Sequence, residues 1–220
     1  LINFINKKSK SVYRIKPHRK NLFIFGTFFG FGFYFSGLHW IVNSLTFDEN
    51  FKILIPFGLI FIPLFLSLFI SLTVIIIGPY LKLNMPSIFL FSSSFALSDY
   101  IRAKILTGFP WNLWAYSFSW ATEFLQVLNH IGLFAFNLII ITIFMIPSVF
   151  FFNINFKKKI SIILLSSLMI FLVSIYGNFS LNKNDQKIKL VDKKFYVKVI
   201  SPNFKLGYNF TKSEMEERLK

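Results

Sequence analysis

The sequence contains no cysteine and few acidic residues, and these two shortages exclude several kinds of site. Without cysteine, the 220 residues hold no disulfide, no thiolate metal site and no cysteine nucleophile. Only 9 acidic residues accompany 24 lysine and arginine residues, which gives a formal net charge of +15. In a soluble protein this excess would suggest nucleic acid as a partner. Here the basic residues flank hydrophobic segments, so membrane topology accounts for many of them and no nucleic-acid partner is expected.

Charged residues make up only 15% of the chain, whereas 55% of it is hydrophobic and 20% aromatic. A soluble domain of this length needs a more polar surface to cover its core. Apolar runs of about 20 residues predict membrane helices, because a helix satisfies its own backbone hydrogen bonds inside lipid. We therefore predict an all-α polytopic membrane protein with five transmembrane helices, at approximately 21–42, 53–77, 87–104, 131–152 and 160–176.

Two of these segments contain residues with a specific effect on packing or on helix geometry. Gly26 and Gly30 have the small-xxx-small spacing that lets two helix backbones approach closely. The second segment contains Pro56 and Pro63. Because proline cannot donate a backbone hydrogen bond, this helix should bend or begin irregularly near Pro56.

The distribution of lysine and arginine predicts which loops face the cytoplasm. By the positive-inside rule, the basic loops lie on the cytoplasmic side. These are the segments 1–20, 79–86 and 153–159. With five crossings, everything after Tyr176 faces outward, and so do the loops at 43–52 and 105–130.

The character of the chain changes after the last apolar segment. A polar linker is followed by "FYVKVIS", which alternates like a strand, and Thr211 with Glu214 forms a capping box that would open a helix. A strand, a loop and a helix are how a soluble α/β domain begins. The expected divisions are a cytoplasmic basic segment at 1–20, a transmembrane domain at 21–178, an outward-facing linker at 179–194 and the start of an α/β domain at 195–220.

The stretch "LTGFPWNLWAY" (106–116) interrupts the helical pattern between two apolar segments. Gly108 frees the backbone to turn, and Pro110 disfavours helical geometry at Phe109. Trp111, Trp114, Tyr116 and Trp120 then follow at spacings that could line an amphipathic helix at the interface. Two interpretations stay open. The stretch is either an aromatic belt that anchors the outer interface or a lipid-binding surface, because irregular backbone at membrane depth needs protein or a cavity beside it.

Two further groups of polar residues were considered as sites. Asp99 and Arg102 share one helix face and are predicted to form a structural ion pair, although charges inside a span are also functional candidates. His39 and His130 offer too few ligands for a metal site. A hydrolase triad of Ser36, His39 and Asp99 would lack the Gly-x-Ser-x-Gly turn. No metal and no cofactor is expected.

Several stretches, in the same order, resemble the bacterial apolipoprotein N-acyltransferases. They are "FFGFGFYFSGLHWI" (28–41), "SDYIRAKILTGFPWNLWAYS" (98–117), "IGLFAFNLIIIT" (131–142) and "VKVISPNF" (197–204). The stretch 107–112 is the most specific of these matches. The resemblance implies a fold with eight membrane helices and a nitrilase-like αββα domain inserted before the last. The five segments here would be the third to the seventh, and 195–220 would be the truncated start of the nitrilase-like domain.

The function implied by the resemblance is acyl transfer in the bacterial inner membrane, with the catalytic side facing the periplasm. A phospholipid would donate a fatty acyl chain to the N-terminal S-diacylglyceryl-cysteine amine of an apolipoprotein, through a thioester on a cysteine helped by a glutamate and a lysine. In the family these three residues lie in the nitrilase-like domain, beyond Lys220. We therefore expect no catalytic residue in this chain, and we expect it to be inactive by itself, as a monomeric fragment of a longer enzyme.

The resemblance also selects candidate residues that line a lipid substrate. They are Trp40, Gly108, Phe109, Pro110, Trp111, Asn112 and Tyr116, with Asn112 and the Tyr116 hydroxyl offered to a head group. The sequence departs from the family pattern at Asp99, which replaces a usual glutamate, and at Phe210, near a position often held by tryptophan. The alternative is a non-enzymatic membrane protein, such as a transporter subunit or a degenerate remnant. A transporter should show paired broken helices, and the sequence shows one such interruption.

Overall fold

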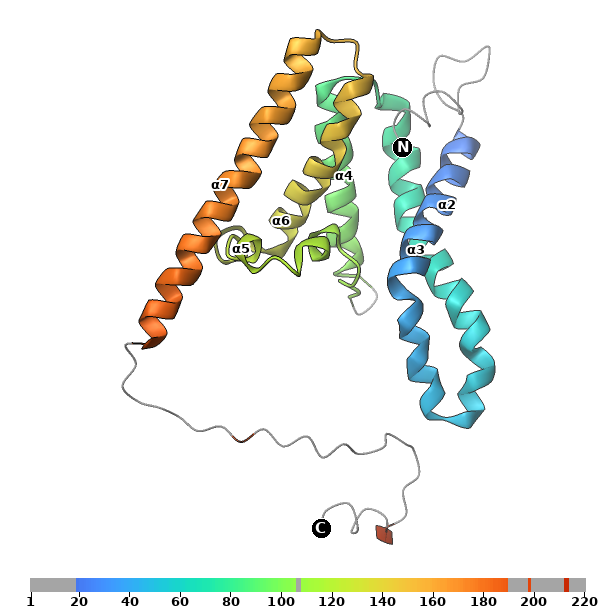
Figure 1. The fold of residues 1–220 in the computed structure, drawn as a ribbon. Helices are drawn as coiled ribbons and strands as arrows, with labels where there is room; N and C mark the ends of the chain where they lie inside the picture. The colour runs from blue at the N-terminus through green and yellow to red at the C-terminus, as the bar shows by residue number, and fades with distance from the viewer. Residues whose placement is uncertain (1–18, 106–107, 190–197, 199–211, 214–220) are drawn as a thin grey trace.

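The computed structural model describes residues 19–105, 108–189, 198 and 212–213, and the regular structure within them is helical. Figure 1 shows long helices that run up and down beside one another. The α-helices are α2 (Arg19–Leu38), α3 (Ile55–Ile77), α4 (Met85–Arg102), α5 (Thr122–Leu125), α6 (Leu128–Met145) and α7 (Phe156–Lys189). Short 3₁₀ helices join or extend them, namely η1 (His39–Phe47), η2 (Glu49–Leu54), η3 (Gly78–Tyr80), η4 (Trp114–Phe118) and η5 (Ile146–Phe151). The expected start of an α/β domain at 195–220 lies almost wholly outside the described residues.

Four helices of the described chain are long and apolar enough to cross a membrane: Arg19–Phe47, Glu49–Tyr80, Leu128–Phe151 and Phe156–Lys189. The prediction of an all-helical membrane protein is therefore confirmed. The expected segment 87–104 corresponds to α4, which is helical but is not among the four. Its serines, Asp99 and Arg102 lower its hydropathy, and several of these polar side chains are buried inside the protein.

Helices α2 and α3 form an antiparallel hairpin with closely packed backbones, as Gly26 and Gly30 predicted. A Cβ atom on Gly26 would lie 2.7 Å from the Cα atom of Ser71, and one on Gly30 would lie 2.9 Å from the Cα atom of Ser67. The hydroxyl oxygens of Thr27 and Ser71 lie 2.8 Å apart across the same contact. Small residues at this interface therefore bring the two helices together.

The beginning of α3 confirms the predicted effect of Pro56. The 3₁₀ helix η2 ends at Leu54, and the chain becomes α-helical at Ile55. Pro56 lies in the first turn of α3, where its missing N–H costs no hydrogen bond. Pro63 lies inside α3 and is buried.

Helix α7 is longer than the sequence suggested. Its 34 residues continue to Lys189, whereas residues 179–194 were expected to be a linker. After Gly177 the segment up to Lys189 contains neither glycine nor proline, and Lys187 and Lys189 occupy the last turn, where positive charge is favourable. A helix of this length measures about 51 Å, which exceeds the hydrocarbon thickness of about 30 Å.

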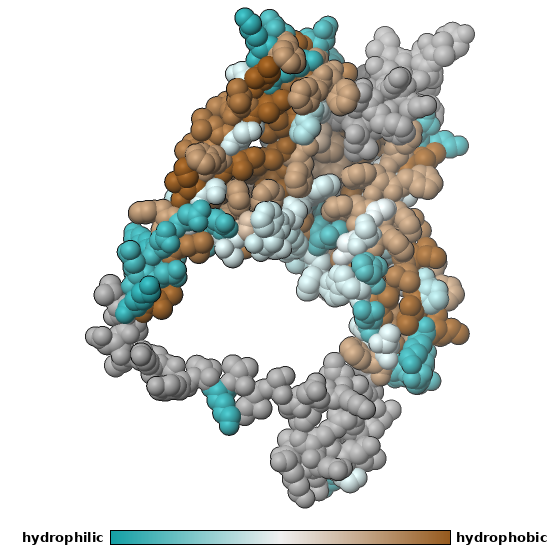
Figure 2. Space-filling model, in the orientation of Figure 1, coloured by the Kyte–Doolittle hydropathy of each residue, from teal (hydrophilic) through white to brown (hydrophobic). Residues whose placement is uncertain are grey.

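The loops gather at two ends of the molecule. In Figure 1 the turns before α4 and before α7 lie at one end, whereas the η1–η2 hairpin, α5 and the segment after α4 lie towards the other. Figure 2 shows hydrophobic residues over the middle of the molecule and hydrophilic residues towards both ends. The segment after α4, residues 108–121, is called the aromatic loop below.

Candidate functional site

The aromatic loop is held by Arg102, the last residue of α4, whose side chain is only 1% exposed. Its Nη1 donates hydrogen bonds to the carbonyl oxygens of Phe109, at 2.7 Å, and Trp111, at 2.8 Å. Its Nη2 donates to Oδ1 of Asp99 at 3.0 Å, so the residues predicted to pair lie in an ion pair. The guanidinium carbon also lies 5.3 Å from the ring centroid of Tyr34 on α2. A single buried cation thus joins α4, the loop and α2.

The other carboxylate oxygen of Asp99 leads to a third helix. Asn137, in the middle of α6, donates a hydrogen bond from Nδ2 to Oδ2 of Asp99 at 2.9 Å. Its own Oδ1 accepts a hydrogen bond from the backbone N–H of Ala115 at 3.0 Å. Asn137 is fully buried, so both polar ends of its amide need these partners. The network therefore connects α4, α6 and three residues of the aromatic loop.

Sequence reasoning missed Asn137 and Tyr34 as part of this site. The signal for Asn137 was present, because it is a single amide in the otherwise apolar stretch "GLFAFNLIIIT". A polar side chain inside a membrane span requires a buried partner. Tyr34 gave no comparable signal, since it is one of many aromatic residues in its segment.

The backbone of the aromatic loop turns at two left-handed residues. Gly108 has φ of +82° and Asn112 has φ of 58°, a region that glycine and asparagine tolerate better than other residues. Asn112 packs against Gly37 of α2 and donates a hydrogen bond from Nδ2 to the carbonyl oxygen of Phe33 at 3.3 Å. Nδ2 of this amide is therefore engaged with α2, and the expected contact of Asn112 with a lipid head group stays a prediction.

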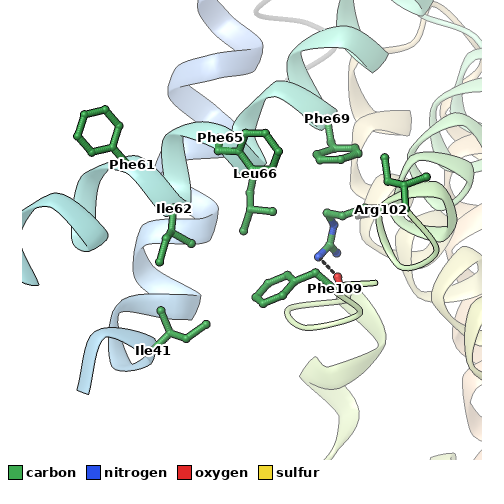
Figure 3. Close-up of a pocket in the computed structure, with 9 residues that line it drawn as sticks. Ile41, Phe61, Ile62, Phe65, Leu66, Phe69, Arg102 and Phe109 are labelled. Carbon is green, nitrogen blue, oxygen red and sulfur yellow. Dashed lines mark hydrogen bonds between the residues drawn. The ribbon is translucent and has the colours of Figure 1, made fainter. Parts of the chain in front are cut away.

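An apolar pocket of about 410 Å³ lies beside the loop (Figure 3). Aromatic and aliphatic side chains of α3 form one wall, and Phe109 and Ile41 approach it from the loop and from η1. Arg102 contributes the one charged side chain among its lining residues, which are Ile41, Phe61, Ile62, Phe65, Leu66, Phe69, Arg102, Ile105 and Phe109. The pocket thus suits an aliphatic chain.

Trp40 and Trp111 stand close in the chain to Ile41 and Phe109, which line this pocket, but they do not line it themselves. The rings of Trp40 and Trp111 meet edge to face with centroids 5.6 Å apart, and they are 44% and 52% exposed. Two of the predicted lipid-lining residues, distant in sequence, are therefore in contact. Tyr116 is 41% exposed, and Pro110 lies in the loop between Phe109 and Trp111.

The predicted amphipathic helix at the interface does not form as a regular element. Only Trp114–Phe118 is helical, as η4, and Trp111 precedes it. Trp114 is turned inward and stacks on Phe33 with ring centroids 4.6 Å apart, whereas Trp120 is 79% exposed. Trp114 therefore anchors the loop to α2.

In the part of the chain that the structure describes, neither His39 nor His130 belongs to a metal site, and the Ser36 hydroxyl and the His39 ring bond to backbone carbonyls. His39 Nδ1 lies 3.0 Å from the carbonyl oxygen of Ser36, and the Ser36 hydroxyl donates to the carbonyl oxygen of Gly32. His130 Nε2 contacts the hydroxyl of Tyr176. Among the described residues there is no group of three histidine, cysteine, aspartate or glutamate side chains that could hold a metal ion.

Comparison with known proteins relates this chain to one enzyme family. Residues 11–146 match the family model described as the apolipoprotein N-acyltransferase N-terminal domain. The chain is 32% identical over 173 residues to an apolipoprotein N-acyltransferase of Rickettsia bellii and 35% identical over 175 residues to one of Rickettsia typhi. Each alignment covers 76% of this chain and 34% of the relative. The chain is also 33% identical over 124 residues to the Brucella melitensis enzyme, covering 56% of the chain and 23% of that relative. The chain thus spans about a third of the length of its Rickettsia relatives, and no solved structure matches it.

Proposed function

Since this chain belongs to the apolipoprotein N-acyltransferase family, we propose that it is the membrane-embedded part of such an enzyme. The enzyme would transfer a fatty acyl chain from a phospholipid donor to the N-terminal S-diacylglyceryl-cysteine amine of an apolipoprotein. The match over residues 11–146 and the named relatives support this assignment. In this proposal a nitrilase-like domain, of which 195–220 would be the start, supplies the cysteine, glutamate and lysine. The enzyme acts as a monomer without a cofactor.

The proposed topology is multi-pass in the bacterial inner membrane, with residues 1–20 in the cytoplasm. Helix α4 is counted as a fifth crossing between α3 and α6. Two observations support this. The basic turns before α4 and α7 lie at the end of the bundle opposite to the aromatic loop (Figure 1), and the most polar side chains of α4, Asp99 and Arg102, are buried against protein. The aromatic loop then faces the periplasm.

The proposed role of the aromatic loop is to bind and orient lipid substrate. The observation that carries it is that Arg102 fixes the carbonyls of Phe109 and Trp111 while the Trp111 indole stays half exposed near an apolar pocket. In this proposal the pocket takes part of an acyl chain. Trp40 and Trp111 form its rim, and the Tyr116 hydroxyl meets the head group. A rigid loop limits the positions that a reacting ester can occupy.

The test compares Trp111→Ala with Trp120→Ala in the intact enzyme that contains this chain. Thioester formation per mole of folded protein is measured in matched vesicles. Trp111→Ala should slow acylation by up to about 100-fold, because misplacing a reacting group by an ångström has effects of that size. Trp120 is 79% exposed and does not line the pocket, so its loss should cost on the order of 1 kcal/mol or less.

Pro110→Ala provides a second variant for the same test. It relieves the restriction on Phe109 and lets this residue become helical, so acylation should also slow if the bend matters. Wild-type rates in both Trp111→Ala and Pro110→Ala would show that the loop is only an interfacial belt.

A further inference from the structure

Helix α7 is attached to the rest of the protein at its two ends and stands away from it in the middle. Towards its C-terminal end, Gly177 packs against the backbone of Glu123, and the Ser180 hydroxyl lies 3.4 Å from the side-chain oxygen of Gln126. At the other end, Lys159 Nζ donates a hydrogen bond to the carbonyl oxygen of Phe150 at 2.8 Å. Ile162 packs there against the cluster that contains Val149.

Between these attachments lies a cavity of about 720 Å³, bounded by α4, α6 and α7 and closed at one end by Phe118 of the aromatic loop and by Phe124 and Val127. Helix α7 lines it with residues of one face: Ile162, Leu165, Ser166, Met169, Ile170 and Val173. Figure 1 shows α6 and α7 diverging from the turn that joins them, and Figure 2 shows hydrophobic residues over both helices.

The lining of this cavity is almost wholly apolar, because its few hydroxyls already have partners. Ser93 donates a hydrogen bond to the carbonyl oxygen of Phe89, Thr142 to that of Leu138 and Ser166 to that of Ile162. An occupant therefore has to be a hydrocarbon, since nothing in the wall would compensate a buried polar group.

The length of the cavity distinguishes between a helix and lipid chains. Its lining on α7 runs from Ile162 to Val173, about 16 Å of helix, whereas a membrane helix needs about 30 Å to cross the hydrocarbon core. An acyl chain that spans one leaflet, about 15 Å, with a cross-section of about 20 Å², has a volume of about 300 Å³. The cavity thus matches the two chains of a phospholipid.

Positive charge at one end of the cavity indicates which kind of head group the lipid carries. Lys158 and Lys159 lie four and three residues before Ile162, so they continue the cavity-lining face of α7 by one turn. Lys158 is exposed, and Lys159 is half-buried with one hydrogen bond to a carbonyl. The neighbouring segments 78–86 and 146–160 contain Lys82 and Lys157 but no aspartate or glutamate. Lysines beside a hydrophobic groove between helices favour a lipid with a negative head group.

We propose that a phospholipid with an anionic head group binds between α4, α6 and α7, with its chains in the cavity and its phosphate beside Lys158 and Lys159. The head group of this lipid lies at the lysine end, opposite to the aromatic loop, whereas its chains point towards Phe118 of the loop. It is therefore a different lipid from the acyl donor, whose head group meets the loop in the proposed function. Its chains fill the space between α7 and the helices α4 and α6, and their contacts stabilise α7 against the bundle. The site depends on the membrane fold and not on the proposed acyl transfer.

The chain is reconstituted in vesicles that contain equal amounts of phosphatidylglycerol and phosphatidylethanolamine, and it is then extracted in mild detergent. Mass spectrometry of the intact complex measures the lipid that stays bound. The wild-type chain should retain one phosphatidylglycerol. Ser166→Phe fills the cavity and should reduce the retained lipid about tenfold. Its control is Ser167→Phe, because Ser167 is exposed and does not line the cavity.

A second pair of variants tests the head group. The double substitution Lys158→Gln and Lys159→Gln should reduce the preference for phosphatidylglycerol by about fivefold for each lysine. The exposed pair Lys183→Gln and Lys187→Gln, at the other end of α7, should leave it unchanged. Equal retention by Ser166→Phe and Ser167→Phe, or no loss of preference in the first lysine pair, would overturn the proposal. So would a wild-type chain that retains no lipid and forms a dimer that Ser166→Phe dissociates. If Ser166→Phe does not fold, the lysine pairs decide the outcome alone.

Discussion

The guanidinium of Arg102 donates a hydrogen bond to the carbonyl oxygen of Trp111 at 2.8 Å, and this contact fixes the backbone of a residue whose indole is 52% exposed. The backbone of the loop is thus held from inside the protein, while its aromatic side chain is presented outside. Asp99 and Asn137 complete the support, because Asp99 accepts a hydrogen bond from Arg102 and another from Asn137, which connects the pair to α6. The buried ion pair of Asp99 and Arg102 thus fixes the backbone conformation of the aromatic loop.

The first prediction concerns the loss of Arg102. Arg102→Met removes the partner of Asp99 and three hydrogen bonds, and it leaves a carboxylate buried without its counter-charge. Breaking a buried ion pair in this way costs about 3–5 kcal/mol. Thermal unfolding in detergent should therefore show a large loss for Arg102→Met. Lys104→Met, an exposed cation two residues later, should change stability by about 0.5 kcal/mol or less. Equal unfolding of the two variants would contradict the role of the buried pair.

The second prediction concerns Asn137. Asn137→Leu leaves the Ala115 N–H and one oxygen of Asp99 without their partner, at about 1–3 kcal/mol for each buried group. Hydrogen exchange at the Ala115 amide should become faster, because the loop opens more often. Thr142→Val is the control, since this hydroxyl bonds only within α6. Unchanged exchange in Asn137→Leu would show that the loop is held without this amide.

The third prediction uses glycines of α2 with different surroundings. Gly26→Ala forces a Cβ atom to 2.7 Å from the Ser71 backbone, whereas the same change at Gly32 meets nothing within 4 Å. Gly26→Ala should destabilise the protein by about 1–3 kcal/mol through overpacking. Gly32→Ala should be neutral or stabilise it by up to about 1 kcal/mol, because alanine favours a helix. The melting temperatures of the two variants test this, and the reverse order would refute close packing of α2 on α3.

The fourth prediction tests the proposed five crossings with reporter fusions. Fusions after Lys20 and Lys82 should report one side of the membrane, and fusions after Gln126 and Asn182 should report the other. The reason is the positive-inside rule together with an odd number of crossings. Lys82 and Gln126 flank α4, so a shared side for these two would mean that α4 does not cross. A shared side for Lys20 and Asn182 would exclude five crossings as a whole.

Composition and local pattern were enough to predict much of the architecture. Long apolar runs predicted membrane helices, because lipid leaves the backbone few other solutions. Gly26 and Gly30 predicted a close helix contact, and Pro56 predicted the irregular start of α3. These are local properties, set by the residue and its neighbours. The spacing of Asp99 and Arg102 also predicted a shared face, which is a property of any helix.

The tertiary structure decided which distant groups meet. No periodicity indicated that Asn137 would reach Asp99 and Ala115, that Trp40 would touch Trp111, or that Asn112 would bond to Phe33 of α2. Each of these contacts depends on how helices separated in sequence pack side by side. The extent of α7 and the cavity beside it have the same origin, since the volume left between helices follows from where their ends are attached. The sequence by itself determined a helical membrane protein with an interrupted aromatic loop, and only packing determined that buried polar groups of α4 and α6 hold this loop in place.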